Sequence, residues 1–272
     1  MFPNQRYGIQ RQLRDGIRGF LLDFHVGVRD GTHIRTVLHD EAERNRIAKA
    51  IGNDAIAVAE RLVGRLGIGD IAGDKDIHMC HSLCELGAEP AVTQMNAFTR
   101  FLRQHPGEVL VMYVEPYVTP AQVRAVFAEA GLPRYVAELK RDEPLSTLGE
   151  LVAADKRVVV LAEQDGGSLP WYLEGFSFSQ DTPLGATKRS QLSCARERGD
   201  DDSPLLTVNH WVDAFPPRPR ANIAFGGSFL VNRLSKCERE RSQLPNVVAV
   251  DFYERSGVVK ATDALNRAAL RR

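Results

Sequence analysis

The chain has 272 residues, with 35 Lys and Arg against 35 Asp and Glu, and 43% of its residues are hydrophobic. A chain of this length can bury one substantial core, so a single domain over residues 1–272 is expected. The formal net charge of zero excludes a global field that would hold the chain on nucleic acid or on anionic lipid. No run of about 18 apolar residues is present, and the first residues, MFPNQRYG, do not read as a signal peptide.

Six short apolar runs each end at a polar residue. Near-continuous runs of Val, Ile and Leu between helical patterns are typical of strands in a buried parallel sheet. In a parallel (β/α) barrel of the TIM type, the carboxyl ends of the strands share one face, and the loops there form the active site. The sequence therefore predicts an α/β barrel with these polar side chains in one cluster. They are Asp23, His81, Glu115, Glu163, Asn209 and Asp251.

Helical patterns alternate with these runs, as right-handed crossovers between parallel strands require. The expected helices cover residues 8–16, two stretches within 29–76, residues 92–102, 119–131 and 147–155, a stretch from about 222, and a terminal helix to Arg272. Thr119-Pro120 and the pair Thr147 and Glu150 are helix start signals. Residues 166–204 show only one doubtful strand. An eight-stranded barrel is thus one strand short, and the missing place is at the N-terminus.

His81 suits general acid/base catalysis, because an imidazole titrates near neutral pH and the other strand ends supply carboxylates. A lone histidine is more often structural, so the catalytic interpretation depends on the strand-end residues around it. Asp251 could orient a histidine and fix its tautomer, or could cap the loop that follows. His81 and Asp251 are therefore the expected catalytic residues.

Asp23 and Glu115 could bind a hard cation such as Ca²⁺, which prefers several oxygen ligands. The alternative is an ion pair with Arg18 or Arg255 inside the barrel mouth. Further side chains of the same face are expected to contact the substrate or shape its electrostatics. They are Glu163, Asn209, His25 and Trp211. Neighbouring residues of a strand point to opposite sides, so His210 cannot face the centre together with Asn209.

The four cysteines leave the compartment open. In an exported protein, Cys80 and Cys84 could form a small disulfide around His81, and Cys194 and Cys237 a long-range one; in the cytosol both pairs would be reduced. The three-residue spacing is not a zinc signature. Glycine-rich phosphate loops of the GxGxxG and GxxxxGK types are absent.

Several segments stand in an order that is characteristic of one family. They are GIRGFLLDFH, MCHSLCELGA, QHPGEVLVMYVEPYV, KRVVVLAE, VNHW and PNVVAVDFYERSG. Together they resemble the phosphatidylinositol-specific phospholipase C X-domain family, nearest to its secreted phosphodiesterase-like members of bacteria and plants. The resemblance runs from Asn4 to about Gly257. It implies a TIM-type barrel that cleaves a phosphodiester with two histidines, one acting as base and one as acid, and His81 matches the acid.

The family's other histidine lies in a Thr-His-Asn motif at the end of the first strand, and this sequence has no such motif. The resemblance therefore implies an N-terminally shortened domain. Either the start lies at an internal methionine of a longer protein, which we expect, or the chain is a truncated relative. The full-length form would be secreted or on the cell surface. Asp23 and Glu115 resemble the metal-dependent variant, with Ca²⁺ as cation, and Asp251 resembles an aspartate that supports the first histidine.

The expected function is hydrolysis of a phosphatidylinositol-like lipid or a related phosphodiester. The expected partner is the phospholipid headgroup or a small phosphodiester, with transient contact to a membrane surface, no nucleic acid, and a monomeric chain. One alternative is a catalytically inactive barrel that binds a lipid headgroup or a partner protein. Another is a glycerophosphodiesterase-like metal enzyme on the same fold. A cyclic phosphate product separates the first reading from the last, because only internal attack makes it.

Overall fold

The computed structural model describes residues 4–30, 33–35, 74–81, 84, 87–213 and 225–271, with positions 45, 49, 52, 53 and 57. The described strands are β1 (Gly19–Asp30), β2 (His33–Arg35), β3 (Lys75–Met79), β4 (Glu89–Pro90), β5 (Leu110–Tyr117), β6 (Val158–Ala162), β7 (Tyr172–Glu174), β8 (Ser179–Asp181), β9 (Leu205–Asn209) and β10 (Val247–Ala249). They form a seven-stranded sheet in the order β4-β3-β1-β5-β6-β7, with β2 beside β1, and a three-stranded sheet in the order β10-β9-β8. The fold is mixed α/β. The described strands do not close into one ring, so the closed barrel stays a prediction.

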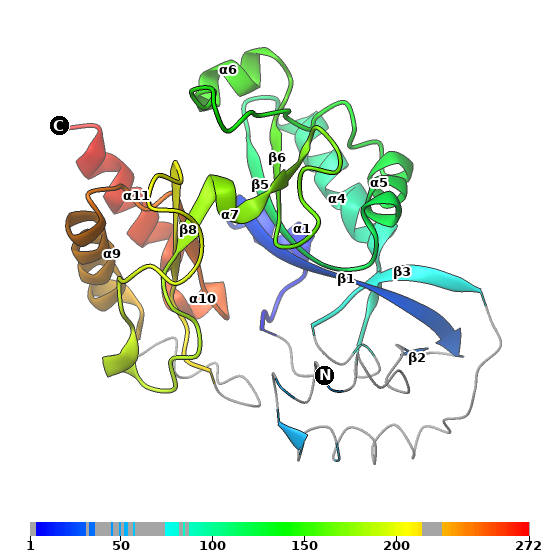
Figure 1. Ribbon diagram of the computed structural model, residues 1–272, viewed down its shortest axis with the longest axis horizontal. Coiled ribbons are helices and arrows are strands. Elements are labelled where there is room, and N and C mark those ends of the chain that lie inside the picture. Colours follow the sequence, from blue (N-terminus) through cyan, green and yellow to red (C-terminus); the bar gives the residue numbers. More distant parts are fainter. Residues whose placement is uncertain are drawn as a thin grey trace.

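Helices cover the outer sides of both sheets (Figure 1). The described helices are α1 (Ile9–Arg14), α4 (Ala91–Gln104), α5 (Pro120–Glu129), α6 (Leu148–Ala153), α7 (Gly175–Phe178), the 3-10 helix η2 (Arg189–Gln191), α9 (Gly227–Arg241), α10 (Tyr253–Ser256) and α11 (Val258–Ala269). In Figure 1, α9 and α11 flank the small sheet on one side of the molecule, and α4 and α5 flank the large sheet on the other. The strands of both sheets therefore lie between helices.

The helix starts follow the expected signals. The side chain of Thr119 accepts a hydrogen bond from the backbone N–H of Gln122 at the start of α5, and Thr147 accepts one from Glu150 at the start of α6. Both are complete capping boxes, which satisfy amide groups that the first helical turn leaves without a partner. The helices predicted at residues 8–16, 92–102, 119–131 and 147–155 are confirmed. The two helical patterns predicted within 29–76 lie largely outside the described residues.

Successive side chains of the parallel strands pack into two different cores. In β5, Leu110, Met112 and Val114 are fully buried against the helices. The intervening residues point to the opposite face, because successive side chains of a strand alternate. On that face Tyr113 belongs to a core that also includes Leu205 of β9 and Val247 of β10. The inner faces of the two sheets therefore share one core.

Polar contacts also join the two inner faces. The Tyr113 hydroxyl donates a hydrogen bond of 2.6 Å to Ser179 of β8 and lies 2.6 Å from the hydroxyl of Thr207 of β9. A second close approach joins β10 to β1. The side chain of Val247 in β10 lies 3.7 Å from the place that a Cβ atom would occupy on Gly19 of β1. The small sheet thus approaches the large one near both β5 and β1.

One part of the strand pattern differs from the expectation of parallel strands. The strand expected to end before Asp23 continues to Asp30, because Val26 and Val28 extend its apolar alternation. Its second half pairs antiparallel with β3, with Phe24 opposite Met79. The run before His81 is therefore an antiparallel strand and not a parallel barrel strand. A run of five residues carries no sequence signal for the direction of its partner.

The poorly patterned region holds more structure than expected. The segment WYLEGFSFSQ contains β7, the short helix α7 and the start of β8. The single doubtful strand is therefore two strands that belong to different sheets. Strands of three residues are too short for an alternation to be recognised.

Candidate active site

A row of acidic side chains crosses the inner face of the large sheet. Asp23 of β1 and Glu115 of β5 are register partners on adjacent parallel strands, which lie about 4.8 Å apart. Glu163 follows β6, and its backbone N–H donates to Val114 of β5. Asp23 is partly exposed as a residue, but its carboxyl group is withdrawn from water. This burial, and then the charges of Glu115 and Glu163, raise the pKa of Asp23 well above its usual value.

Two aromatic rings support this row. Tyr117, two residues after Glu115 on the same face of β5, donates a hydrogen bond to the Glu115 carboxylate. His25 of β1 is the register partner of Tyr117, and the two rings stack with centroids 4.1 Å apart and planes 13° from parallel. His25 is 4% exposed. The orientation of the His25 ring is therefore fixed within the sheet.

His81 reaches this row through the antiparallel pairing of β3. Because Met79 lies opposite Phe24, the turn that follows β3 arrives beside the part of β1 that carries Asp23. A disulfide between Cys80 and Cys84 closes this turn. His81 remains exposed as a residue, yet partial withdrawal of its ring from water lowers its pKa, against the raising effects of Glu115 and Asp213. His81 is thus within electrostatic range of two carboxylates.

A partly buried ion-pair network continues the row into the small sheet. Arg198 donates to Asp181 at the end of β8 at 2.9 Å and to Glu163 at 3.1 Å. Asn209, at the end of β9, donates to the same Asp181 carboxylate at 3.2 Å. Burial raises the pKa of Glu163, and Arg198 opposes that rise. The guanidinium thereby joins acidic groups of both sheets.

Asp251 follows β10 and completes the set of strand-end residues. Burial, and then the charge of Asp213, raise the pKa of Asp251 to about 7, and a hydrogen bond with Asn4 opposes this rise. Asp213 is also the residue that acts on His81, so it links the two expected catalytic residues electrostatically. Trp211 donates its indole N–H to Asp213 at 2.8 Å and so helps to position that carboxylate.

The alternative ion pairs of Asp23 and Glu115 are absent among the described residues. Arg18 forms its ion pair with Glu108 at 2.7 Å, on the side of the sheet where β5 begins. Arg255 lies 3.6 Å from Glu254, its neighbour in the chain. Neither arginine therefore neutralises the acidic row.

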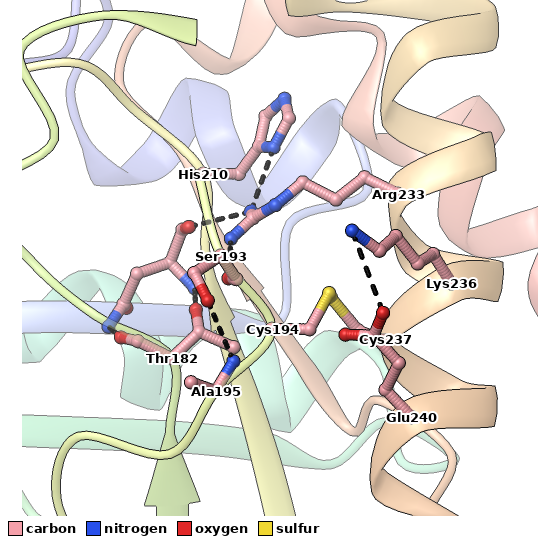
Figure 2. Close-up of a disulfide and its surroundings, with 10 residues drawn as sticks. Thr182, Ser193, Cys194, Ala195, His210, Arg233, Lys236, Cys237 and Glu240 are labelled. Carbon is pink, nitrogen blue, oxygen red and sulfur yellow. Dashed lines mark hydrogen bonds and ion pairs between the residues drawn. A yellow bond between two sulfur atoms is a disulfide. The ribbon is translucent and has the colours of Figure 1, made fainter. Parts of the chain in front are cut away.

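His210 belongs to a separate polar cluster on the outer side of the small sheet (Figure 2). The Arg233 side chain of α9 donates to the carbonyl groups of Asn209 and Ser193, both at 2.7 Å, and lies 3.0 Å from Nδ1 of His210. Burial lowers the pKa of His210 to about 4. The expectation that His210 and Asn209 point to different sides is in agreement with these contacts.

The second disulfide lies beside this cluster. Cys194 and Cys237 are joined, and both are buried. Figure 2 shows the bond between the loop that carries Ser193 and helix α9. The disulfide and Arg233 together tie this loop to α9, four residues before Arg198 enters the acidic row.

Some residues of the site had no usable sequence signal. Asp181 ends a three-residue strand, and Arg198 lies in a loop with the composition of a solvated surface. Asp213 lies in the loop after β9, four residues past the end of that strand. Tyr117 could have been found, since it stands two residues after Glu115 and shares its face. Only the folded chain brings Arg198 to Asp181 and Glu163.

The fold matches a known phospholipase. The structure of phosphatidylinositol-specific phospholipase C from Listeria monocytogenes aligns with a TM-score of 0.50 and 13% sequence identity, over 92% of this chain and 79% of that chain. At this identity the match shows a shared fold. No described helix combines the length and the apolar character needed to cross a bilayer.

Sequence comparison gives the family. A family model described as PI-PLC X 1 matches residues 67–266. PI-PLC X domain-containing protein 1 of Arthroderma benhamiae is 27% identical over 79% of this chain and 78% of its own length. PI-PLC X domain-containing protein At5g67130 of Arabidopsis thaliana is 26% identical over 72% of this chain and 50% of its own. The chain belongs to the PI-PLC X domain family.

A third similar protein carries a name that bears on location. It is called an uncharacterized secreted protein, comes from Arthroderma benhamiae, and is 22% identical over 65% of this chain and 46% of its own length. The chain thus spans about half of this protein and of the Arabidopsis relative.

Proposed function

We propose that this chain is a phosphodiesterase of phospholipase C type that cleaves a phosphatidylinositol-like lipid. The observation that carries the proposal is the arrangement of His81, Asp23, Glu115 and Asp251 around the ends of strands from both sheets, in a member of the PI-PLC X domain family. In the proposed form, the two sheets are parts of one TIM-type barrel, and the ends of its strands surround the phosphate.

His81 acts as the general acid in this proposal. Its lowered pKa makes the imidazolium a stronger proton donor than a free histidine, while the carboxylate of Glu115 favours the charged form. The proton passes from a ring nitrogen of His81 to the oxygen of the departing diacylglycerol. Proton transfer of this kind contributes about 10²–10⁴-fold to a rate.

Asp251 is the residue of this chain suited to take the proton from the attacking hydroxyl of the headgroup. A pKa of about 7 keeps a sizeable fraction ionised at neutral pH and leaves the carboxylate basic enough to accept a proton. In this proposal Asp251 is therefore the general base among the residues of this chain.

Asp23 and Glu115 fit a hard cation. Two neighbouring carboxylates without an arginine partner among the described residues, one with its pKa raised by burial and by the other's charge, are the oxygen donors that Ca²⁺ prefers. A bound Ca²⁺ would supply positive charge for the phosphate of the substrate. Without a cation, protonation of Asp23, whose pKa is raised, would relieve the repulsion between the two groups.

Secretion is part of the proposal. Two disulfides fit an oxidising compartment, and one relative is named as a secreted protein. We propose that the exported protein acts as a monomer, and that it meets its lipid headgroup by transient contact with a membrane surface.

The product of the reaction tests this function. Purified chain is incubated with phosphatidylinositol vesicles, with Ca²⁺ or with EGTA, and the phosphorus-containing products are followed by ³¹P NMR. Cyclic inositol phosphate that forms with Ca²⁺ and is suppressed by EGTA is the expected result. An acyclic phosphomonoester as the first product would show water attack and overturn the proposal in favour of a glycerophosphodiesterase-like reaction. Vesicle binding without any product would overturn it in favour of an inactive headgroup-binding protein.

A further inference from the structure

Outside the acidic row, one cluster combines soft metal ligands from two distant parts of the chain. A ring nitrogen of His25 and the sulfur atoms of Cys80 and Cys84 all lie within 4.8 Å of one another. His25 comes from β1, and the two cysteines enclose the turn after β3. The antiparallel pairing of β1 and β3 brings them together, with His25 opposite His78 in the register.

We propose that, when the Cys80–Cys84 disulfide is reduced, His25, Cys80 and Cys84 bind one Zn²⁺ ion through a ring nitrogen and two thiolates. Zinc takes Cys sulfur at about 2.3 Å and His nitrogen at about 2.0–2.1 Å. With these bond lengths, two ligand atoms of a tetrahedral ion lie about 3.5–3.8 Å apart. The two sulfur atoms, bonded in the disulfide, must therefore move apart on reduction, and all three ligand atoms can do so within the 4.8 Å span of this cluster. A water molecule takes the fourth position, as in zinc sites with two cysteines and one histidine.

The surroundings suit this ion. Two thiolates and a neutral imidazole balance the charge of Zn²⁺, so a neutral complex forms in a place where His25 and Cys84 are buried. An unbalanced charge would be costly there. The stack of His25 on Tyr117 holds the ring in one orientation, which lowers the ordering cost of binding. Soft sulfur ligands also separate this site from the oxygen ligands of Asp23 and Glu115.

The disulfide and the zinc site are alternative states of the same two sulfur atoms. A dithiol reductant gives two electrons and two protons to the Cys80–Cys84 bond and is itself oxidised to a disulfide. Zn²⁺ then displaces the two thiol protons as it binds. The loop that this disulfide closes has a sequence separation of 4, against 43 for Cys194–Cys237. The shorter loop gives the smaller entropic protection against reduction.

Metal titration of the full chain tests the site without any measurement of lipid cleavage, so its outcome is independent of the proposed function. The chain is reduced with a phosphine under argon and titrated with Zn²⁺ against a chromophoric chelator, and with Co²⁺ for its thiolate charge-transfer absorption. One ion per reduced chain is expected, and none on the oxidised chain. His25→Gln should weaken binding at least about tenfold, and Cys84→Ser should remove the charge-transfer band. His105→Ala, at an exposed histidine on the end of α4, should leave both unchanged.

Alkylation identifies the sulfur atoms independently. Zn²⁺ should protect Cys80 and Cys84 of the reduced chain from iodoacetamide, while Cys194 and Cys237 stay unprotected, as read by peptide mass spectrometry. Circular dichroism verifies that each variant is folded, and the wild-type protection pattern decides the question if one is not. Protection of Cys194 and Cys237 instead, or zinc affinity that is the same in folded His25→Gln and in the wild type, would overturn the proposal.

Discussion

Asp23 is a residue whose carboxyl group is withdrawn from water and lies beside the charges of Glu115 and Glu163. A carboxylate in this situation is stabilised either by a proton or by a cation. The two cases respond differently to Ca²⁺, which makes this residue a direct probe of the proposed cation site.

Ca²⁺ should raise the thermal stability of the wild type, and Asp23→Asn should abolish that response. At a Ca²⁺ concentration of about 100 times Kd, a ligand specific for the folded state adds about 2.7 kcal/mol. Without Ca²⁺ the asparagine variant should be more stable than the wild type at neutral pH, because its amide is neutral without the free-energy cost of protonating, or burying the charge of, a carboxyl group at this place. Differential scanning calorimetry with Ca²⁺ and with EGTA measures both effects. Asp263→Asn, on the exposed side of α11, is the control, and an unchanged Ca²⁺ response in Asp23→Asn would exclude Asp23 as a ligand.

The raised pKa of Asp251 should make the free energy of unfolding depend on pH. Its pKa is about 7 in the folded chain against about 3.9 when unfolded, so the folded state holds a proton that the unfolded state has lost between these values. The contribution of Asp251 to the free energy of unfolding should therefore fall as pH rises from 4 to 7, by up to about 4 kcal/mol. Asp251→Asn should remove this loss, so that it exceeds the wild type in stability at pH 7 and equals it near pH 3. Urea unfolding over this pH range provides the measurement, and parallel pH profiles of the two proteins would contradict it.

The strand-end residues could be predicted because each follows an apolar run that a sequence pattern reveals. Asp23, Glu115 and Asp251 are predicted as site residues in this way. Arg198 was not, because its contacts with Asp181 and Glu163 depend on how a long irregular loop folds back. Its loop composition is that of an ordinary solvated surface.

At the scale of elements, the apolar run before His81 shows that a sequence pattern can predict a strand without its direction. The apolar residues of β3 predict a strand, but the same residues fit a parallel or an antiparallel partner. The actual antiparallel pairing with β1 still places the following turn beside Asp23. The sequence predicted His81 beside Asp23 as the end residue of a parallel strand, whereas in the structure the antiparallel pairing of β3 with β1 brings it there.

The two disulfides should contribute unequally to stability. By loop-closure entropy, the separation of 43 residues between Cys194 and Cys237 corresponds to about 4 kcal/mol, and the separation of 4 between Cys80 and Cys84 to about 2 kcal/mol. The pair Cys194→Ala and Cys237→Ala should thus lower the free energy of unfolding more than the pair Cys80→Ala and Cys84→Ala. Guanidinium unfolding of both double variants compares them. A larger loss from the shorter loop would show that packing around Cys84 outweighs loop entropy.

At the scale of the whole molecule, Tyr113 is a buried link between the sheets. It reaches from β5 to hydroxyl groups on β8 and β9, and burial raises its pKa to about 12, so it stays neutral. Two sheets that share such a contact and one apolar core should unfold together. The sequence predicted six strands and one doubtful one, without an indication that they divide into two sheets, because β7 and β8 are only three residues long.

Tyr113→Phe should destabilise the chain by about 1–2 kcal/mol, because it removes hydrogen bonds to two buried hydroxyl groups. Ser179 and Thr207 lie 3.0 Å apart and can compensate by bonding each other, which keeps the loss moderate. Tyr172→Phe is the matched control, since the buried Tyr172 hydroxyl has no hydrogen-bond partner among the described residues. That variant should be at least as stable as the wild type. Urea unfolding that ranks the two variants in the opposite order would contradict the proposed role of Tyr113.

The rate at which His81→Ala cleaves phosphatidylinositol vesicles tests the proposed site most directly. With Ca²⁺ present, the wild type and His105→Ala should release cyclic inositol phosphate at the same rate, and His81→Ala should be slower by about 10²–10⁴-fold with an unchanged circular dichroism spectrum. Equal rates for folded His81→Ala and the wild type, whether both are fast or both at background, would contradict the assignment of His81 as the acid of a phosphodiesterase.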